Sequence, residues 1–291
     1  MTRRTRWDRA QALRDVLWAD ARAGHALTDA VLERFRTDRL RYSDILEWSL
    51  GADAETVDTA RFSFAFPEHT RTRLEVARTI VAWADMVGPA AGRAARAAVR
   101  AARPAVVEQL MIGYADGAGA PARTKLYLQF RADAGPAALE LAHAVLGTRQ
   151  PTESDALPLH LLGLDVGATG LCGAKLYFVE AEHPARPGAW PRALTNALRI
   201  HRLRAPDDPG FSRASEIDFA LADNQLSWAE LRGWPAVQAA GSGPRRFDEL
   251  ARQFRLRPRR ISLPLSGPAK LNIYYVLDEP EDEPGVSGTK P

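Results

Sequence analysis

The lysines of this chain constrain its fold most strongly, because three of the four stand at the same place in the same short pattern. Of 39 basic residues only four are Lys, at Lys125, Lys175, Lys270 and Lys290. The first three each open an alternating run of aromatic and aliphatic residues, which predicts a β-strand. Side chains two apart on a strand share a face, so each run has Lys with Tyr or Asn on one face and mostly aliphatic residues on the other.

The same split between faces recurs along the chain and groups the strands into repeats. The runs predict five hairpins, with helical stretches between most of them, at a spacing of about fifty residues. The predicted hairpins cover 43–66, 105–131, 158–181, 197–222 and 257–278, and the predicted helices cover 69–86, 90–102, 136–146, 227–239 and 245–254. The link over 183–196 is short and proline-rich. We expect one domain over 1–279, with two leading helices in 1–41 and a disordered tail at 280–291.

The polar faces of these strands allow two architectures. An open sheet with helices on one side would leave the lysines in ordinary solvent. A closed antiparallel sheet with helices outside would place the polar faces in a central cavity. We expect the second, an α/β fold of the α+β kind in which ββαα repeats form an antiparallel ten-stranded closed β-barrel surrounded by helices.

A cavity lined by these strands would need a bound anion. Lys and Arg side chains gathered away from water are costly without an opposite charge. A diphosphate would supply that charge and suits both side chains. Gly163 to Gly173 contains four glycines but not the order of a phosphate-binding loop, so cations carried by strands are the expected ligands. The Tyr rings beside the lysines would stabilise a cation and exclude water, as an allylic carbocation requires.

Composition excludes several other classes of protein. The single cysteine, Cys172, excludes an internal disulfide framework and a cysteine zinc site, and it fits a cytoplasmic protein. No apolar run is long enough for a transmembrane helix, and the basic start does not resemble a secretory signal. A net charge of +3 does not indicate a nucleic-acid binder. We expect no membrane or nucleic-acid partner, and a monomer.

The order of these blocks resembles the dimethylallyltryptophan synthase branch of the ABBA aromatic prenyltransferases. Residues 46–50 are similar to the family's early strand with its catalytic Glu, and 61–68 to the next strand with its diphosphate-binding Arg. The Lys-x-Tyr runs at 125–127 and 175–177 match a recurring pair of a diphosphate-binding Lys and a shielding Tyr. The last strand, 270–275, is more similar to the bacterial phenol and naphthalene branch. The resemblance extends in short blocks over about residues 43–278.

The resemblance implies an enzyme that moves a prenyl group, dimethylallyl being expected, from its diphosphate to an indole ring of tryptophan, a natural product or a peptide. The implied diphosphate-binding residues are Arg61, Lys125, Lys175, Lys270 and, as a poorer candidate, Arg260. The implied tyrosine shield comprises Tyr127, Tyr177 and Tyr274. Glu47 is the implied catalytic residue and would accept the indole N–H. No metal or other cofactor is expected, because Arg61 stands where the magnesium-dependent branch has an acidic residue.

Some features depart from the family and leave alternatives open. The stretch 109–116 has no Lys, so Asp116, Tyr114 or water would remove the ring proton. Glu216 and Asp218 stand where a cation or amide is more usual, and they are candidates for binding an ammonium group of the acceptor. One rival interpretation is an enzyme of the same fold with a phenolic or naphthalene acceptor. Another is a barrel that binds an anionic ligand without catalysis.

Overall fold

The computed structural model describes the helices and strands of the central part of the chain and the strands that flank it. The described residues are 30, 46–52, 61–65, 73–117, 120–147, 157–180, 194–204, 216–221, 249, 252–254, 256–264 and 271–277. Side chains are described for 30, 73–115, 123–147, 157–179, 249, 252–254 and 274.

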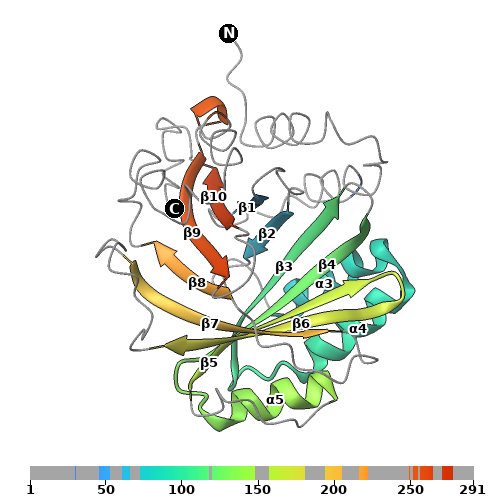
Figure 1. Cartoon of the computed structure of the whole chain (residues 1–291). Coiled ribbons are helices and arrows are strands. Elements are labelled where there is room, and N and C mark those ends of the chain that lie inside the picture. Colours follow the sequence, from blue (N-terminus) through green and yellow to red (C-terminus); the bar gives the residue numbers. More distant parts are fainter. Residues whose placement is uncertain are drawn as a thin grey trace, which may run out of the picture.

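Ten strands and three helices have described bounds (Figure 1). The strands are β1 (Leu46–Ala52), β2 (Arg61–Ala65), β3 (Val107–Gly117), β4 (Ala120–Phe130), β5 (Leu159–Gly167), β6 (Gly170–Glu180), β7 (Leu194–Arg204), β8 (Glu216–Leu221), β9 (Leu256–Pro264) and β10 (Leu271–Leu277). The helices are α3 (Arg73–Val87), α4 (Pro89–Ala101) and α5 (Pro136–Leu146).

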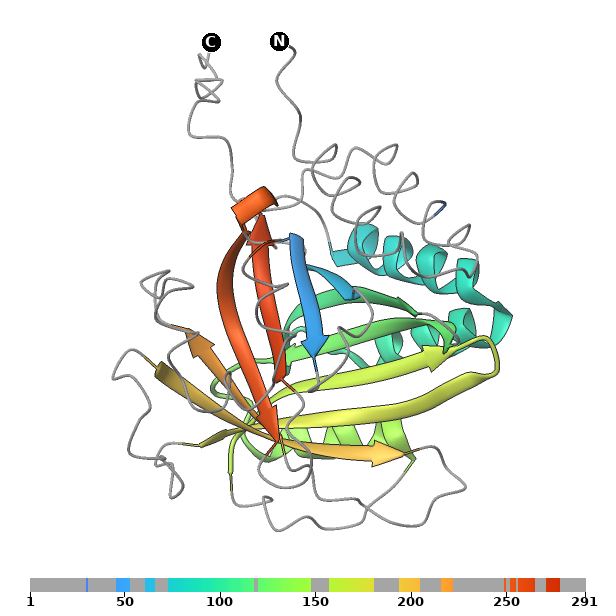
Figure 2. The ribbon, with the colours of Figure 1, turned by 45° about the horizontal axis from the view of Figure 1, so that its top comes forward.

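All pairings between these strands are antiparallel, and consecutive strands of each predicted hairpin are neighbours. The order β1-β10-β9-β8-β7-β6-β5-β4-β3-β2 returns to its start, because β1 pairs with both β10 and β2. Figures 1 and 2 show α3, α4 and α5 lying on one side of β3–β6. The expected antiparallel sheet with helices outside it is confirmed.

The three helices bury one stripe each against the sheet. In α3 the buried residues are Val76, Ile80, Trp83 and Ala84, a spacing that places them on one helical face. Helix α4 buries only small residues, Ala91, Gly92, Ala95 and Ala98. Both α4 and α5 begin with Pro in the first turn, where its missing N–H costs nothing. Helix α5 ends at Gly147, whose φ of 69° is the left-handed conformation that favours glycine.

The expected hairpins and the first three expected helices are present, with small shifts in their bounds. Strand β7 begins at Leu194, so the link expected over 183–196 ends earlier than predicted. Of the expected helix at 245–254, residues 249 and 252–254 are described, and they are helical. The leading segment is described only at Ala30, and 227–239 and 280–291 lie outside the described residues. Among the described helices, none combines the length and the apolar character that a membrane crossing requires.

Candidate functional site

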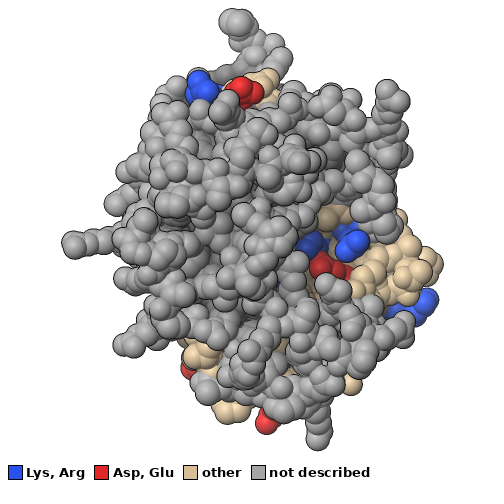
Figure 3. Space-filling model, in the orientation of Figure 1, with Lys and Arg blue, Asp and Glu red and all other residues tan. Residues whose placement is uncertain are grey.

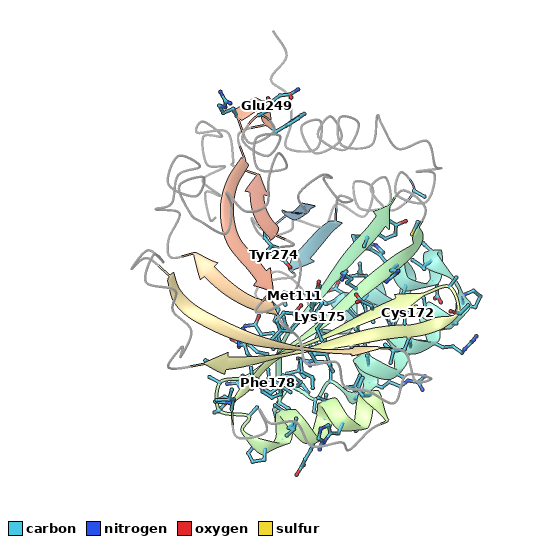
Figure 4. All side chains as sticks on the ribbon, viewed as in Figure 1. Met111, Cys172, Lys175, Phe178, Glu249 and Tyr274 are labelled. Carbon is cyan, nitrogen blue, oxygen red and sulfur yellow. The ribbon has the colours of Figure 1, made fainter. Side chains whose placement is uncertain are left out.

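The strands β3–β6 have two chemically different faces. In β4, Thr124, Leu126, Leu128 and Phe130 are buried, whereas Lys125, Tyr127 and Gln129 between them are partly exposed. The buried set lies on the face covered by the helices, which we call the outer face. Figure 4 shows Phe178 on this outer side, toward α5, and Met111 and Lys175 on the other side. The face that carries Lys125 and Tyr127 is the inner face.

The strand register extends the inner face from Lys125 to the first two strands. Residues directly opposite each other in an antiparallel pair share a face. Lys125 lies opposite Gly113, Gly113 lies opposite Ser63, and Ser63 lies opposite Glu47. Arg61 is two residues before Ser63 on β2 and therefore occupies the same face. The positions of Glu47 and Arg61 thus belong to the face of Lys125.

The register extends the inner face equally far in the other direction. Tyr127 lies opposite Gly163, and Gly163 lies opposite Lys175. Tyr177, two residues after Lys175, lies opposite Ile200, and Ile200 lies opposite Glu216. Asp218 follows Glu216 by two residues and shares its face. The predicted acceptor-binding positions therefore also occupy the inner face.

The register of β8, β9 and β10 joins the two ends of the inner face. Ala220, two residues after Asp218, lies opposite Arg260, and Arg260 lies opposite Tyr274. Tyr274 in turn lies opposite Ser49, which lies opposite Arg61. The inner face traced in one direction therefore meets the inner face traced in the other. Eleven residues were predicted as the catalytic Glu, the diphosphate ligands, the tyrosine shield and the acceptor-binding pair. Ten of them are described and occupy positions on this face, and Lys270 lies outside the described residues.

The lysine of β4 is held by a carboxylate on the neighbouring strand. Lys125 Nζ donates to Asp165 Oδ1 at 2.7 Å, and the two residues are directly opposite each other on β4 and β5. Their side chains are 13% and 23% exposed, so the pair is largely shielded from water. The interaction is therefore screened less than a surface ion pair. Asp165 carries no sequence pattern that marks it as a site residue.

Glycines lie opposite the long polar side chains of the inner face. Lys125 has Gly113 as its partner on β3, and Lys175 has Gly163 as its partner on β5. Asp165 has Gly173 as its partner on β6. Because glycine has no side chain, none of these three positions adds a side chain of its own beside the charged residue. Basic and acidic side chains are also visible next to each other in a recess of the surface shown in Figure 3.

Two of the predicted shield tyrosines approach each other across Gly163. A Cβ added at Gly163 would lie 3.1 Å from Cε1 of Tyr127 and 3.4 Å from Cε2 of Tyr177. Tyr177 is 4% exposed and forms an apolar cluster with Leu161, against which Met111, Tyr127 and Val179 pack. The two rings are thus fixed by packing next to the charged residues. Tyr274 of β10 is partly exposed, and Figure 4 shows it on the side of the sheet away from α5.

One sequence-based alternative does not fit the placement of its residue. Tyr114 was a candidate for removing the ring proton, but it lies opposite Thr124, which belongs to the buried outer face. Tyr114 itself is 2% exposed. A proton acceptor on that face could not reach a substrate on the inner face. The side chain of Asp116, the other protein candidate, lies outside the described side chains.

No group of three His, Cys, Asp or Glu side chains placed to bind a metal ion occurs in the part of the chain whose side chains are described. Cys172 lies near the β5–β6 turn, where its Sγ is 3.4 Å from the carbonyl oxygen of Gly170.

Comparison with known proteins finds relatives by structure and not by sequence. No protein-family model matches the chain, and no curated protein matches it. The prenyltransferase PriB, solved with L-tryptophan and dimethylallyl thiolodiphosphate, matches with a TM-score of 0.67 at 16% identity, over 94% of this chain and 96% of its own.

Two further solved structures match over nearly their whole length. The 5-dimethylallyl tryptophan synthase of Streptomyces coelicolor gives a TM-score of 0.67 at 13% identity, over 96% of this chain and 98% of its own. The 6-dimethylallyltryptophan synthase of Micromonospora olivasterospora gives a TM-score of 0.63 at 12% identity, over 96% of this chain and 100% of its own. The resemblance inferred from the strand motifs is thus confirmed for the fold: this chain has the fold of the ABBA-type tryptophan prenyltransferases.

Proposed function

We propose that this chain is a metal-independent aromatic prenyltransferase, which transfers a dimethylallyl group from its diphosphate to the indole ring of tryptophan or of an indole-containing product or peptide. The observation that carries the proposal is the shared inner face, on which the strand register aligns the positions of Lys125 and Lys175 with those of the three predicted shield tyrosines. The matching solved structures support it, since two of them are dimethylallyltryptophan synthases and the third, PriB, is a prenyltransferase solved with L-tryptophan and a dimethylallyl diphosphate analogue. In this proposal the ten strands form a closed barrel, and the active unit is a monomer in the cytoplasm.

The first step in the proposed reaction is ionisation of the prenyl diphosphate. Lys125 and Lys175, with Arg61, Lys270 and Arg260, bind the diphosphate oxygens. The bond between the allylic carbon and the diphosphate oxygen breaks, and its electron pair stays with the departing diphosphate. Cations held in place before the reaction stabilise this growing negative charge without reorganisation. Removing any one of these cations should therefore slow ionisation strongly. The free energy of unfolding should change little by comparison.

The second step is capture of the carbocation by the indole ring. The faces of Tyr127, Tyr177 and Tyr274 stabilise the cation through their ring quadrupoles and keep water away from it. Glu47 accepts a hydrogen bond from the indole N–H, which raises the electron density of the ring as its carbon forms the new bond. The proton on that carbon then leaves to water or to Asp116, which restores aromaticity. Asp116 stays a candidate because the β3–β4 register shifts between Ala115 and Gly117, so the alternation that places Tyr114 on the outer face does not extend to it.

The carboxylates of β8 have a separate role in the proposal. Glu216 and Asp218 bind the ammonium group of an amino acid or peptide acceptor, a charge that a simple indole or a naphthalene lacks. A phenolic or naphthalene acceptor is the second candidate function, and the likeness of residues 270–275 to that branch favours it. The two candidates predict different products from a mixture of acceptors.

The test is an incubation of the purified chain with dimethylallyl diphosphate and a panel of acceptors. The panel holds tryptophan, indole dipeptides and dihydroxynaphthalenes, each with and without an excess of chelator, and products are identified by mass. Prenylated tryptophan or indole peptide, formed equally in chelator, is the expected result. Prenylated naphthalene alone would transfer the assignment to the second candidate. Diphosphate binding without any product would favour the remaining interpretation, a barrel that binds an anion without catalysis.

The role of Glu47 is tested by its isosteric amide. Glu47→Gln should lower turnover of indole acceptors by about 100-fold or more, since general base contributions are typically of this size. The control is Glu108→Gln, because Glu108 is exposed on β3 and has no part in the proposed site. Equal turnover in the two variants would remove Glu47 from the mechanism.

A further inference from the structure

The ion pair between Lys125 and Asp165 joins a proposed diphosphate ligand to a carboxylate of the protein itself. Both side chains lie on the inner face, 2.7 Å apart at Nζ and Oδ1, and both are mostly shielded from water. Lys125 is also one of the cations proposed to hold the diphosphate. The ammonium that the substrate needs is therefore in contact with a carboxylate of the protein.

A carboxylate at this place opposes the binding of an anion. An ammonium has three donors, so Lys125 can in principle contact two acceptors at once. Two negative charges brought together in a site of low water content repel each other strongly, however. A diphosphate that reaches Lys125 must either displace Asp165 or bind beside its charge. In both cases Asp165 lowers the affinity for diphosphate.

Asp165 is the member of the pair that can leave its partner more easily. The residues directly opposite the pair, Gly173 on β6 for Asp165 and Gly113 on β3 for Lys125, are both glycines and contribute no side chain of their own. The carboxylate is also the more exposed member of the pair, at 23% against 13% for the lysine. It can therefore regain contact with water when an anion takes its place.

We propose that Asp165 is a resident counter-ion of Lys125, which holds the ammonium in position in the empty site and competes with diphosphate for it. Its effect is to weaken the binding of diphosphate, and so to speed release of the diphosphate product after prenyl transfer. Asp165 is then a positioning residue and takes no part in bond making. This inference rests on the proposed function, because it assumes that diphosphate binds at Lys125.

The test compares the affinity of the full-length protein for inorganic diphosphate by calorimetry. Asp165→Asn removes the charge and keeps the size, so the Kd for diphosphate should fall by about tenfold, a modest effect for one unit charge at close range. Asp165→Glu keeps the charge and should bind as the wild type does. The matched control is Asp133→Asn, which breaks an exposed pair with Arg131 and should leave the Kd unchanged.

Steady-state kinetics give a second readout that a purely structural role would not produce. In Asp165→Asn the KM for dimethylallyl diphosphate and the inhibition constant of inorganic diphosphate should both fall, and kcat should fall as product release becomes slower. A structural role predicts the opposite for KM, because a badly placed Lys125 binds the substrate less well. If Asp165→Asn does not fold, Asp165→Ser provides the same comparison.

The outcomes separate this inference from the proposed function. An unchanged or weaker affinity for diphosphate in a folded Asp165→Asn protein, with a wild type that binds diphosphate and forms product, overturns the role of Asp165 alone. A wild type that binds no diphosphate overturns the inference together with the proposed function. Tighter binding in Asp165→Asn, with wild-type affinity in Asp165→Glu, supports the inference.

Discussion

The two faces of the strands β3–β6 share one backbone but have opposite characters. The outer face is built of fully buried aliphatic and aromatic side chains, such as Leu128, Leu176 and Phe178, beneath helices α3–α5. The inner face alternates with it residue by residue and holds a shielded ion pair, glycines and tyrosines. Burial of apolar surface drives folding, whereas charge gathered away from water costs stability. The comparison therefore predicts that the outer face determines stability and the inner face determines chemistry.

The largest expected effect is on stability and comes from the outer face. Phe178 is 0% exposed, so Phe178→Ala should lower the free energy of unfolding by about 3–5 kcal/mol. Urea denaturation measures the loss, and Leu74→Ala is the control, since Leu74 is 58% exposed on α3. The fraction that stays folded should turn over substrate at nearly the wild-type rate. A loss below about 1 kcal/mol would mean that this face is not the core.

The corresponding change on the inner face should affect turnover instead. Lys125→Ala should lower kcat by about 100- to 1,000-fold, as removal of one preorganised charge does in other enzymes. Its cost to the free energy of unfolding should be about 1–3 kcal/mol, because Asp165 loses its partner but is 23% exposed and keeps contact with water. Arg131→Ala is the control, since the Arg131 side chain pairs with Asp133 at an exposed site. Equal turnover in the two variants would contradict the assignment of the inner face.

A smaller effect is expected where the two tyrosine rings meet. In Gly163→Ala the new Cβ would lie 3.1–3.2 Å from the ring of Tyr127, which must move by a few tenths of an ångström. We expect turnover to fall by about tenfold, because catalysis is sensitive to small misplacements. The cost in stability should be about 1–3 kcal/mol. Steady-state kinetics with an acceptor that reacts slowly measure turnover, and thermal unfolding measures stability. Unchanged kinetics would show that the placement of the Tyr127 ring does not affect turnover.

The smallest effect is expected on the solvent side of the helices. Arg96 and Asp85 form a pair at 2.9 Å between α4 and α3, but their side chains are 40% and 43% exposed. Arg96→Ala should change the free energy of unfolding by less than about 1 kcal/mol. Turnover should not change at all. Thermal unfolding at low and high salt is the measurement, and a larger, salt-insensitive loss would mean that this pair contributes to the core.

The sequence predicted the two faces well because alternation is a local property of a strand. Lys125, Tyr127 and the aliphatic residues between them follow a period of two, and their faces are those that the pattern indicates. The five hairpins were predictable for the same reason. Helix α3 was expected from 69; its described bounds begin at Arg73, and 69–72 lie outside the described residues.

The sequence could not reveal which residues meet across neighbouring strands. Asp165 is two residues after Gly163 in a strand rich in leucine, and nothing near it in the sequence indicates a partner on another hairpin. Its contact with Lys125 depends on the register between β4 and β5, which are joined through α5 and not by a tight turn. Tyr114 was misjudged for a simpler reason. Tyr114 follows the buried residues Leu110 and Ile112 at a spacing of two, which already places it on the outer face.

A crystal structure of the protein with dimethylallyl thiolodiphosphate tests the proposed site most directly. If cations from separate strands bind one diphosphate on the inner face, its oxygens will lie about 3 Å from Nζ of both Lys125 and Lys175, with the dimethylallyl group beside Tyr127 and Tyr177. A diphosphate bound elsewhere, or one that contacts neither lysine, would contradict the proposed site.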